Sequence, residues 1–197
     1  RDPKRDVMLP TFERVKAMAE GAAIMANVDY KYSLISGIYE TLVNREGGKI
    51  MQNNLELLGP ITYTEEEEAY GKAIQEATGK PQVGMDGKVH PLKETEKLPG
   101  GGSTDVGDVS WNVPNINLGV TVAPKDTPWH SWAVVACGGM SIGHKGMIYA
   151  SKAMGMTMLD LFDDPKLVEK VKKEYKTRKG DVKYEAMIDG PPPIPGK

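Results

Sequence analysis

Residues 100–153 read GGGSTDVGDVSWNVPNINLGVTVAPKDTPWHSWAVVACGGMSIGHKGMIYASKA, and this stretch decides the predicted fold. It holds all three tryptophans, the only cysteine and two of the three histidines. Apolar runs predict a strand over residues 115–123 and a second one over residues 133–136, and the glycine-rich SIGHKG segment opens a helix. Short strands next to helices indicate an α/β fold for this part of the chain.

The flanking sequence predicts mostly helices. Thr64 and Glu67 form a capping-box pattern, which places the four glutamates at 65–68 in the first turn of a helix rather than at a metal site. Val28, Tyr30 and Tyr32 alternate with polar residues, as in a half-buried strand. One helix and one strand do not fold alone, so the first lobe needs further strands from elsewhere. The predicted helices cover residues 11–25, 49–58, 64–79, 141–162 and 165–179, the predicted strand covers residues 28–35, and a long loop that contains His90 covers residues 80–102.

Composition limits the function classes. The 197 residues carry a net charge of −2, and the basic run at 166–178 is balanced by acidic residues, so nothing predicts a nucleic-acid partner. No apolar run approaches the roughly 18 residues of a membrane span, and no secretory signal opens the chain. A single cysteine, Cys137, predicted to be buried in a strand and not nucleophilic, fits a reducing, cytoplasmic compartment. Because Arg1 rather than Met comes first, we expect the chain to be part of something longer.

His130 is the strongest candidate for a metal ligand. It lies between two tryptophans where a loop meets a predicted strand, and such junctions often carry reactive groups. Its imidazole suits a metal ligand or a general base. Binding to backbone carbonyls in a purely structural role is an equally good interpretation of the spacing. A zinc site needs three or more protein ligands, and the sequence pattern supplies one good candidate.

Four further residues are candidates for groups that support a site. Ser103, Asp105 and Asp108 follow the glycine run at 100–102, where the backbone can approach a ligand closely. The two aspartates could orient a ligating histidine, or they could only cap a turn. His144 begins a helix, with Ser141 as a possible cap, and could contact substrate or only tie the helix to its neighbours.

Three motifs resemble the C-terminal part of the p-aminobenzoyl-glutamate hydrolase type of amidohydrolase, in the aminoacylase and carboxypeptidase-G class of metallopeptidases. They are GGSTDVGDVSWNVP, TPWHSW and GMSIGHKGMIYASKAM. The upstream segments RDPKRD, ERVKAMAEGAA, LVNREGGKIMQNNLELLGP and TEEEEAYGKAIQEATG are similar to the end of that family's lid and its return into the catalytic domain. The resemblance therefore extends over essentially the whole chain.

The resemblance implies a fold and a cofactor. Residues 1–44 would be the second half of a ferredoxin-like (α+β) lid and dimerisation domain, and residues 45–197 the C-terminal part of a zinc-peptidase-like α/β catalytic domain. The full-length enzyme would hold two zinc or manganese ions, with His130 matching the last ligand. Residues 103–108 match a loop that lines the metal site, and His144 matches a supporting position. Asn44 is a candidate substrate contact, or an asparagine needed only for its backbone conformation.

The resemblance also implies what this chain lacks. In the family the other metal ligands and the glutamate base precede the lid, so we expect this chain alone to be inactive and possibly to bind no metal. The parent enzyme would hydrolyse the amide bond of aminobenzoyl-glutamate, other N-acyl amino acids or small peptides. It would form a homodimer through the lid or a hetero-oligomer with a related protein. The alternative is a non-catalytic binding or assembly module with the same fold.

Overall fold

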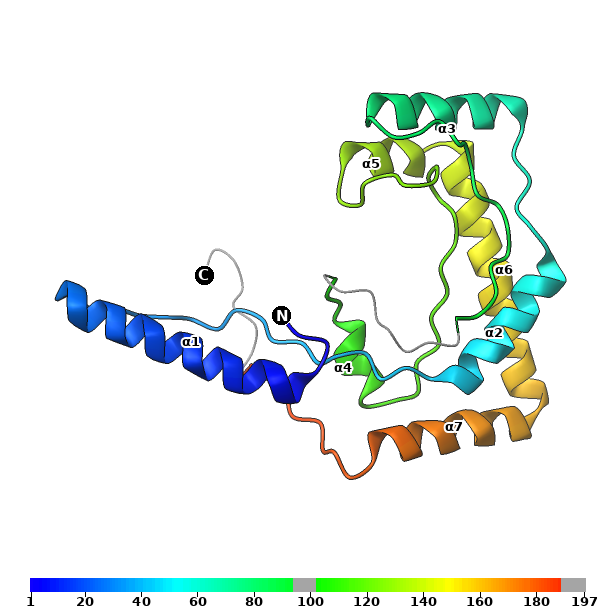
Figure 1. Ribbon diagram of the computed structural model, residues 1–197. Helices are drawn as coiled ribbons and strands as arrows, with labels where there is room; N and C mark the ends of the chain where they lie inside the picture. Colours follow the sequence, from blue (N-terminus) through cyan, green and yellow to red (C-terminus); the bar gives the residue numbers. More distant parts are fainter. Residues whose placement is uncertain (94–101, 189–197) are drawn as a thin grey trace, which may run out of the picture. The chain divides into compact units, whose positions relative to one another are not determined.

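A computed structural model describes residues 1–93 and 102–188, which form two compact units (Figure 1). The first unit comprises Arg1–Val43, Glu94–Asn115 and Tyr175–Lys197, and the second comprises Asn44–Lys93 and Ile116–Glu174. The predicted division of the chain at residue 44 into a lid and a catalytic domain stays a prediction. Gly100, Gly101 and the PPPIPG tail lie outside the described residues.

The predicted α/β fold with a ferredoxin-like lid is wrong for this chain. The regular structure of the described ranges is helical, and neither range contains a strand. The helices are α1 (Arg5–Ala26), α2 (Arg45–Leu58), α3 (Glu65–Ala77), α4 (Val106–Ser110), α5 (Trp132–Gly138), α6 (Ser141–Asp163) and α7 (Pro165–Lys179).

The predicted strands fail for two different reasons. Residues 133–136 lie inside α5, so their apolar character reflects a buried helix. Residues 28–35, predicted from alternation, and residues 115–123, predicted from an apolar run, carry no strand, because neither segment forms a ladder with another described segment. A strand exists only where neighbouring backbone groups pair, and sequence alternation does not supply the partner.

In the second unit, α2 and α5 both pack against α6. The hydrophobic core consists of Ile74 from α3, Ala133 and Cys137 from α5, and Ile142 from α6. Glycine at position 146 lets α6 approach the extended segment closely, because a Cβ there would lie 2.5 Å from the carbonyl oxygen of Thr121. Burial of these apolar side chains is what holds α3, α5 and α6 together.

Some helix boundaries follow local signals. Thr64 and Glu67 form the predicted capping box of α3, and Asn27 ends α1 in the left-handed conformation. Helix α1 begins at Arg5, before the predicted start at residue 11, and the hydroxyl of Thr11 donates back to the carbonyl of Val7 inside the helix. Helix α2 likewise begins four residues before the predicted start, at Arg45.

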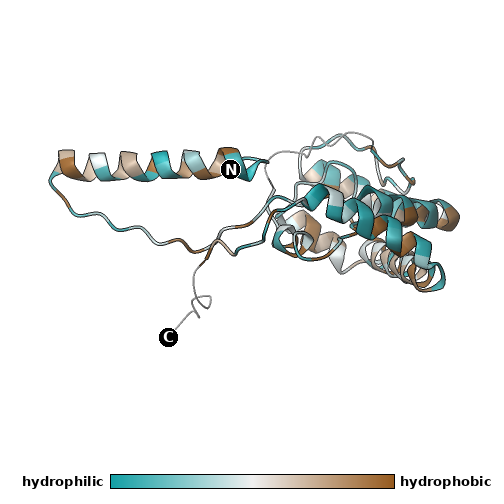
Figure 2. Cartoon of the chain, turned by 90° about the horizontal axis from the view of Figure 1, so that it is seen from below, coloured by the Kyte–Doolittle hydropathy of each residue, from teal (hydrophilic) through white to brown (hydrophobic). Residues whose placement is uncertain are grey.

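The first unit is held together by side chains from α4 and its flanks. The carboxylate of Asp108 accepts from the backbone N–H of Tyr39 at 3.0 Å, and the hydroxyl of Ser110 accepts from the N–H of Leu42 at 2.8 Å. The Trp111 indole N–H donates to the carbonyl of Glu40 at 2.7 Å. By contrast, α1 has no buried residue, and Figure 2 shows hydrophobic positions along it.

Candidate functional site

His130 belongs to a tight loop, residues 124–131, in the second unit. Two hydroxyls fold the loop back on itself: Thr127 Oγ1 donates to the carbonyl of Pro124 and Ser131 Oγ to that of Pro128, each at 2.6 Å. Asp126 and His130 both adopt left-handed backbone conformations, with φ of 62° and 57°. A non-glycine residue at positive φ is uncommon, although aspartate and histidine tolerate it better than most. The loop thus presents His130 on a defined turn immediately before α5.

The base of this loop is fixed by Gln75 of α3, which is fully buried. Its amide nitrogen donates to the carbonyl of Lys125 at 2.9 Å and to that of Gly84 at 3.3 Å. Its amide oxygen accepts from the N–H of Gly84 at 2.9 Å. Because a buried amide must find partners for both ends, this geometry specifies how the loop sits on α3.

The imidazole of His130 faces solvent. It is exposed and makes no hydrogen bond with any described residue. The flanking Trp129 and Trp132 are 70% and 58% exposed, which is unusual for such large apolar side chains. Trp129 also lines an open cavity of about 690 Å³, along with Thr127 and Val134, whereas His130 is not among its lining residues. An unpartnered imidazole at an open surface can accept a metal ion or a proton.

His144 and Cys137 are placed differently. His144 lies in the first turn of α6, which begins at Ser141, and its side chain is exposed. The expected cap is absent, since Met140 holds the capping position without a side-chain bond. Cys137 is fully buried, as predicted, but on a helix instead of a strand. Burial raises the pKa of its thiol, which agrees with a structural role.

Ser103, Asp105 and Asp108 belong to the first unit. Ser103 and Asp105 are exposed, and Asp105 precedes α4 without making a side-chain cap bond. Asp108 binds the backbone of Tyr39 and faces Tyr184, whose pKa is raised by burial and, secondarily, by the charge of Asp108. Asp108 thus has a structural task within its own unit, besides any role in a site.

Asn44 is buried and caps α2. Its amide oxygen accepts from the N–H of Gly47 at 2.8 Å, and its amide nitrogen donates to the carbonyl of Val171 at 2.9 Å. Both ends of the amide are therefore occupied within the second unit. This placement accounts for an asparagine at the start of α2 without a ligand.

The predicted metal ligand and its predicted supporting loop fall in different units: His130 and His144 in the second, Ser103, Asp105 and Asp108 in the first. Within residues 1–93 and 102–188 no three His, Cys, Asp or Glu side chains gather closely enough to hold a metal ion. In the same residues no helix is long and apolar enough to cross a membrane.

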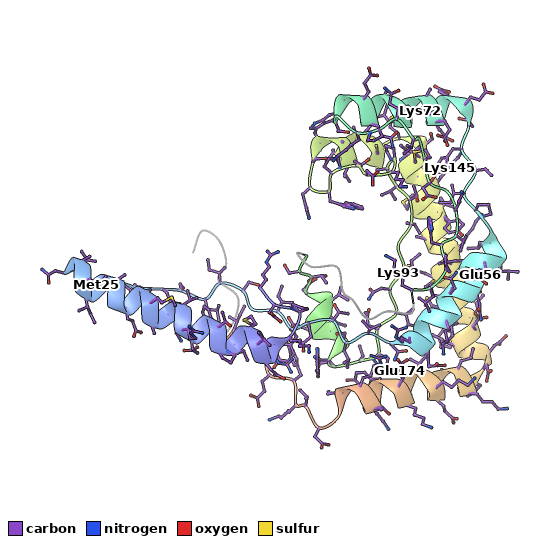
Figure 3. All side chains as sticks on the ribbon, viewed as in Figure 1. Met25, Glu56, Lys72, Lys93, Lys145 and Glu174 are labelled. Carbon is purple, nitrogen blue, oxygen red and sulfur yellow. The ribbon has the colours of Figure 1, made fainter. Side chains whose placement is uncertain are left out.

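Sequence reasoning missed two features of the second unit. Gln75 gave no signal, because a glutamine late in an amphipathic helix is ordinarily exposed. Lys145 of α6, labelled in Figure 3, pairs with Glu67 and donates to the carbonyl of Thr62 at 2.9 Å. The capping box predicted the local role of Glu67, but its partner lies 78 residues away along the chain.

Comparison with known proteins confirms the resemblance to p-aminobenzoyl-glutamate hydrolase. The chain is 30% identical over 203 residues to the B-subunit of p-aminobenzoyl-glutamate hydrolase from Escherichia coli (strain K12). The match covers 89% of this chain and 41% of that protein, so the chain spans about two fifths of the length of the curated relative. No protein-family model matches the chain. No solved structure matches it either.

Proposed function

We propose that this chain is the C-terminal part of a metal-dependent amidohydrolase that cleaves the amide bond of aminobenzoyl-glutamate or of another N-acyl amino acid. The similarity to the hydrolase relative along 89% of the chain is the observation that carries the proposal. The exposed, unpartnered imidazole of His130 on its constrained loop supports it further.

His130 would supply one ligand to a zinc or manganese site. A neutral imidazole is a common ligand for both ions, and the ring is open to solvent on a loop whose base Gln75 fixes. Such a site needs at least three protein ligands, so the other donors would come from a part of the longer enzyme outside this chain. When bound, the metal would activate water and polarise the amide carbonyl.

Other residues around His130 would orient its imidazole and shield a bound substrate from water. Ser131 and Thr127 hold the loop that carries His130, and the neighbouring tryptophans would exclude water from a bound substrate. Without the other ligands and a general base, the chain alone would not hydrolyse amides. We further propose that the enzyme is cytoplasmic and works either as a homodimer or, because the relative is named as one component of a hydrolase, together with a related protein.

The test replaces His130 by Ala in the longer polypeptide encoded by the reading frame that contains this sequence. We expect the variant to retain less zinc or manganese and to lose most of its p-aminobenzoyl-glutamate hydrolysis. His90→Ala is the matched control, since its side chain is exposed in the same unit. Unchanged metal content and rate in His130→Ala would contradict the proposal and favour a non-catalytic assembly module.

A further inference from the structure

The second unit contains an open cavity of about 690 Å³ that reaches the turn before α5. Residues 120–124 line one side of it, and the other lining residues include Lys80, Trp129 and Val134. Its volume lies within the roughly 300–1,000 Å³ that is typical of sites for small organic ligands. Of the described residues that line the cavity, Trp129 lies closest to His130 along the chain.

Trp129 is held in a fixed turn while its indole stays open to solvent. The hydrogen bond from Ser131 Oγ to the carbonyl of Pro128 closes this turn around Trp129 and His130. The two enclosed residues are neighbours in the chain, so their Cα atoms are about 3.8 Å apart. The side chain of Trp129 is nevertheless 70% exposed, although large aromatic side chains are ordinarily well buried. An exposed aromatic surface that is already fixed in position binds a ligand with little further loss of conformational entropy.

The charges around the cavity suit an uncharged group. Among the described residues that line it, the ionisable ones are Lys80 and Asp126, one of each sign, and both are exposed. Thr127 also lines the cavity, but its hydroxyl donates to the carbonyl of Pro124 at 2.6 Å. Such a lining offers no net charge to attract a dicarboxylate such as a glutamate group. A neutral aromatic ring fits better, because a ring that packs on an indole gains free energy beyond that of its buried area.

We propose that Trp129 binds the aromatic acyl group of the substrate, so that the enzyme prefers aroyl amides over aliphatic acyl amides. This inference rests on the proposed amide hydrolysis at His130. In an aroyl amide the ring is bonded directly to the carbonyl carbon, so the residue that holds the ring must lie next to the group that acts on the carbonyl. Trp129 meets this requirement, because it adjoins His130 in the chain and also lines the cavity. Its indole is then the group that selects the acyl half of the substrate.

Two glutamate amides with different acyl groups test this preference in the longer polypeptide encoded by the same reading frame. We expect Trp129→Leu to lower kcat/KM for p-aminobenzoyl-glutamate at least about tenfold, and that for N-acetyl-glutamate less than about twofold. Trp129→Phe should keep most of the preference, because it keeps an aromatic ring. Val135→Ala is the control, since it also shortens a largely exposed apolar side chain but lies outside the cavity lining. An unchanged ratio of the two kcat/KM values in Trp129→Leu would overturn the proposal.

Binding of p-aminobenzoate to the metal-free longer polypeptide gives a second test that needs no hydrolysis. We expect calorimetry to show a Kd at least about tenfold higher in Trp129→Leu than in the native protein or in Val135→Ala. Equal Kd values, or no binding to the native protein, would overturn the proposal. So would a Trp129→Leu variant that loses stability but keeps the native Kd, since another part of the protein would then cover the indole. Failure of the hydrolysis proposal is seen separately, as unchanged metal content and rate in His130→Ala.

Discussion

Lys145 Nζ lies 2.5 Å from Glu67 Oε2, and this pair fastens α6 to the first turn of α3. The Glu67 side chain is 8% exposed and also accepts from the backbone N–H of Thr64 at 2.8 Å. The hydrogen bond from Lys145, followed by that from Thr64, lowers the pKa of Glu67 to about 2. One carboxylate therefore completes a capping box and an ion pair between two helices.

The lowered pKa of Glu67 predicts how stability depends on pH. A carboxylate whose pKa is lower in the folded than in the unfolded state stabilises above its unfolded value and loses that contribution as the pH falls. Here the loss should run from about pH 5 down to the folded pKa of about 2. We expect Glu67→Gln to cost about 1–3 kcal/mol of unfolding free energy at pH 7, and this difference from the native chain should shrink toward pH 2.

Chemical denaturation at several pH values measures this difference. Glu66→Gln is the control, because Glu66 is exposed in the same first turn and is expected to change the free energy of unfolding by less than about 0.5 kcal/mol. A difference between Glu67→Gln and the native chain that stays constant from pH 7 to pH 2 would show that the carboxylate is not held ionised by Lys145.

The sequence predicted features that depend on neighbouring residues well, and contacts between distant segments poorly. Thr64 and Glu67 carry their structural signal within a few residues of themselves, and the structure confirms the capping box. The apolar run at residues 115–123 predicted a strand, and alternation predicted another at residues 28–35. A sheet, however, depends on which other backbone lies alongside, and the described residues provide none. The α/β prediction failed at this step.

The same limit applies to the candidate site. The WHSW motif at residues 129–132 indicated an unusual histidine, and the structure shows that histidine exposed on a constrained turn. Its relation to Ser103 or Asp108 could not follow from spacing, because these residues lie in different units. Gln75, which fixes the base of the loop, is recognisable only once α3 and the loop are brought together.

Gln75→Leu should destabilise the second unit by about 2–4 kcal/mol. Leucine has a similar volume, but it would leave the buried N–H of Gly84 and the partly buried carbonyl of Lys125 without their partners. Thermal and chemical denaturation measure the cost, with the exposed Glu76→Leu as the control on the same helix. A loss below about 0.5 kcal/mol would mean that water replaces the glutamine at the base of the loop.

Gly107→Ala should disrupt the contact between α4 and residues 38–42 in the first unit. Gly107 is buried, and a Cβ there would collide with the carbonyl oxygen of Tyr39, a backbone atom that cannot turn aside. We expect a cost of more than about 2 kcal/mol, against almost none for Gly102→Ala, where a Cβ meets nothing within 4 Å. Exposure of Trp111, followed by fluorescence quenching, reports the change; equal quenching in the two variants would contradict the packing described.

Arg5→Lys tests whether a planar guanidinium is needed at the start of α1. The guanidinium lies 3.9 Å from the centre of the Tyr39 ring and 4.7 Å from that of Trp111, and it pairs with Glu40 at 3.4 Å. Lysine keeps the charge but not the stacking, so we expect a loss of about 1 kcal/mol. Arg14→Lys, at an exposed position on the same helix, should be neutral. Equal stability of the two variants would show that charge alone accounts for the contact.

Cys137 provides a probe of the core of the second unit, because it is the only cysteine in the chain. Its side chain is fully buried, and burial raises the pKa of the thiol. In the native protein a reagent therefore reaches the sulfur rarely, and little of the thiol is ionised. Alkylation by iodoacetamide at pH 8 should therefore be at least about a hundredfold slower in the native chain than in denaturant. Mass spectrometry of quenched samples gives both rates. Gln75→Leu should speed the native reaction, since Gln75 neighbours Ile74 on α3 and Ile74 shares one core cluster with Cys137. A native rate close to the denatured one in the unsubstituted chain would mean that α5 does not stay packed on α6.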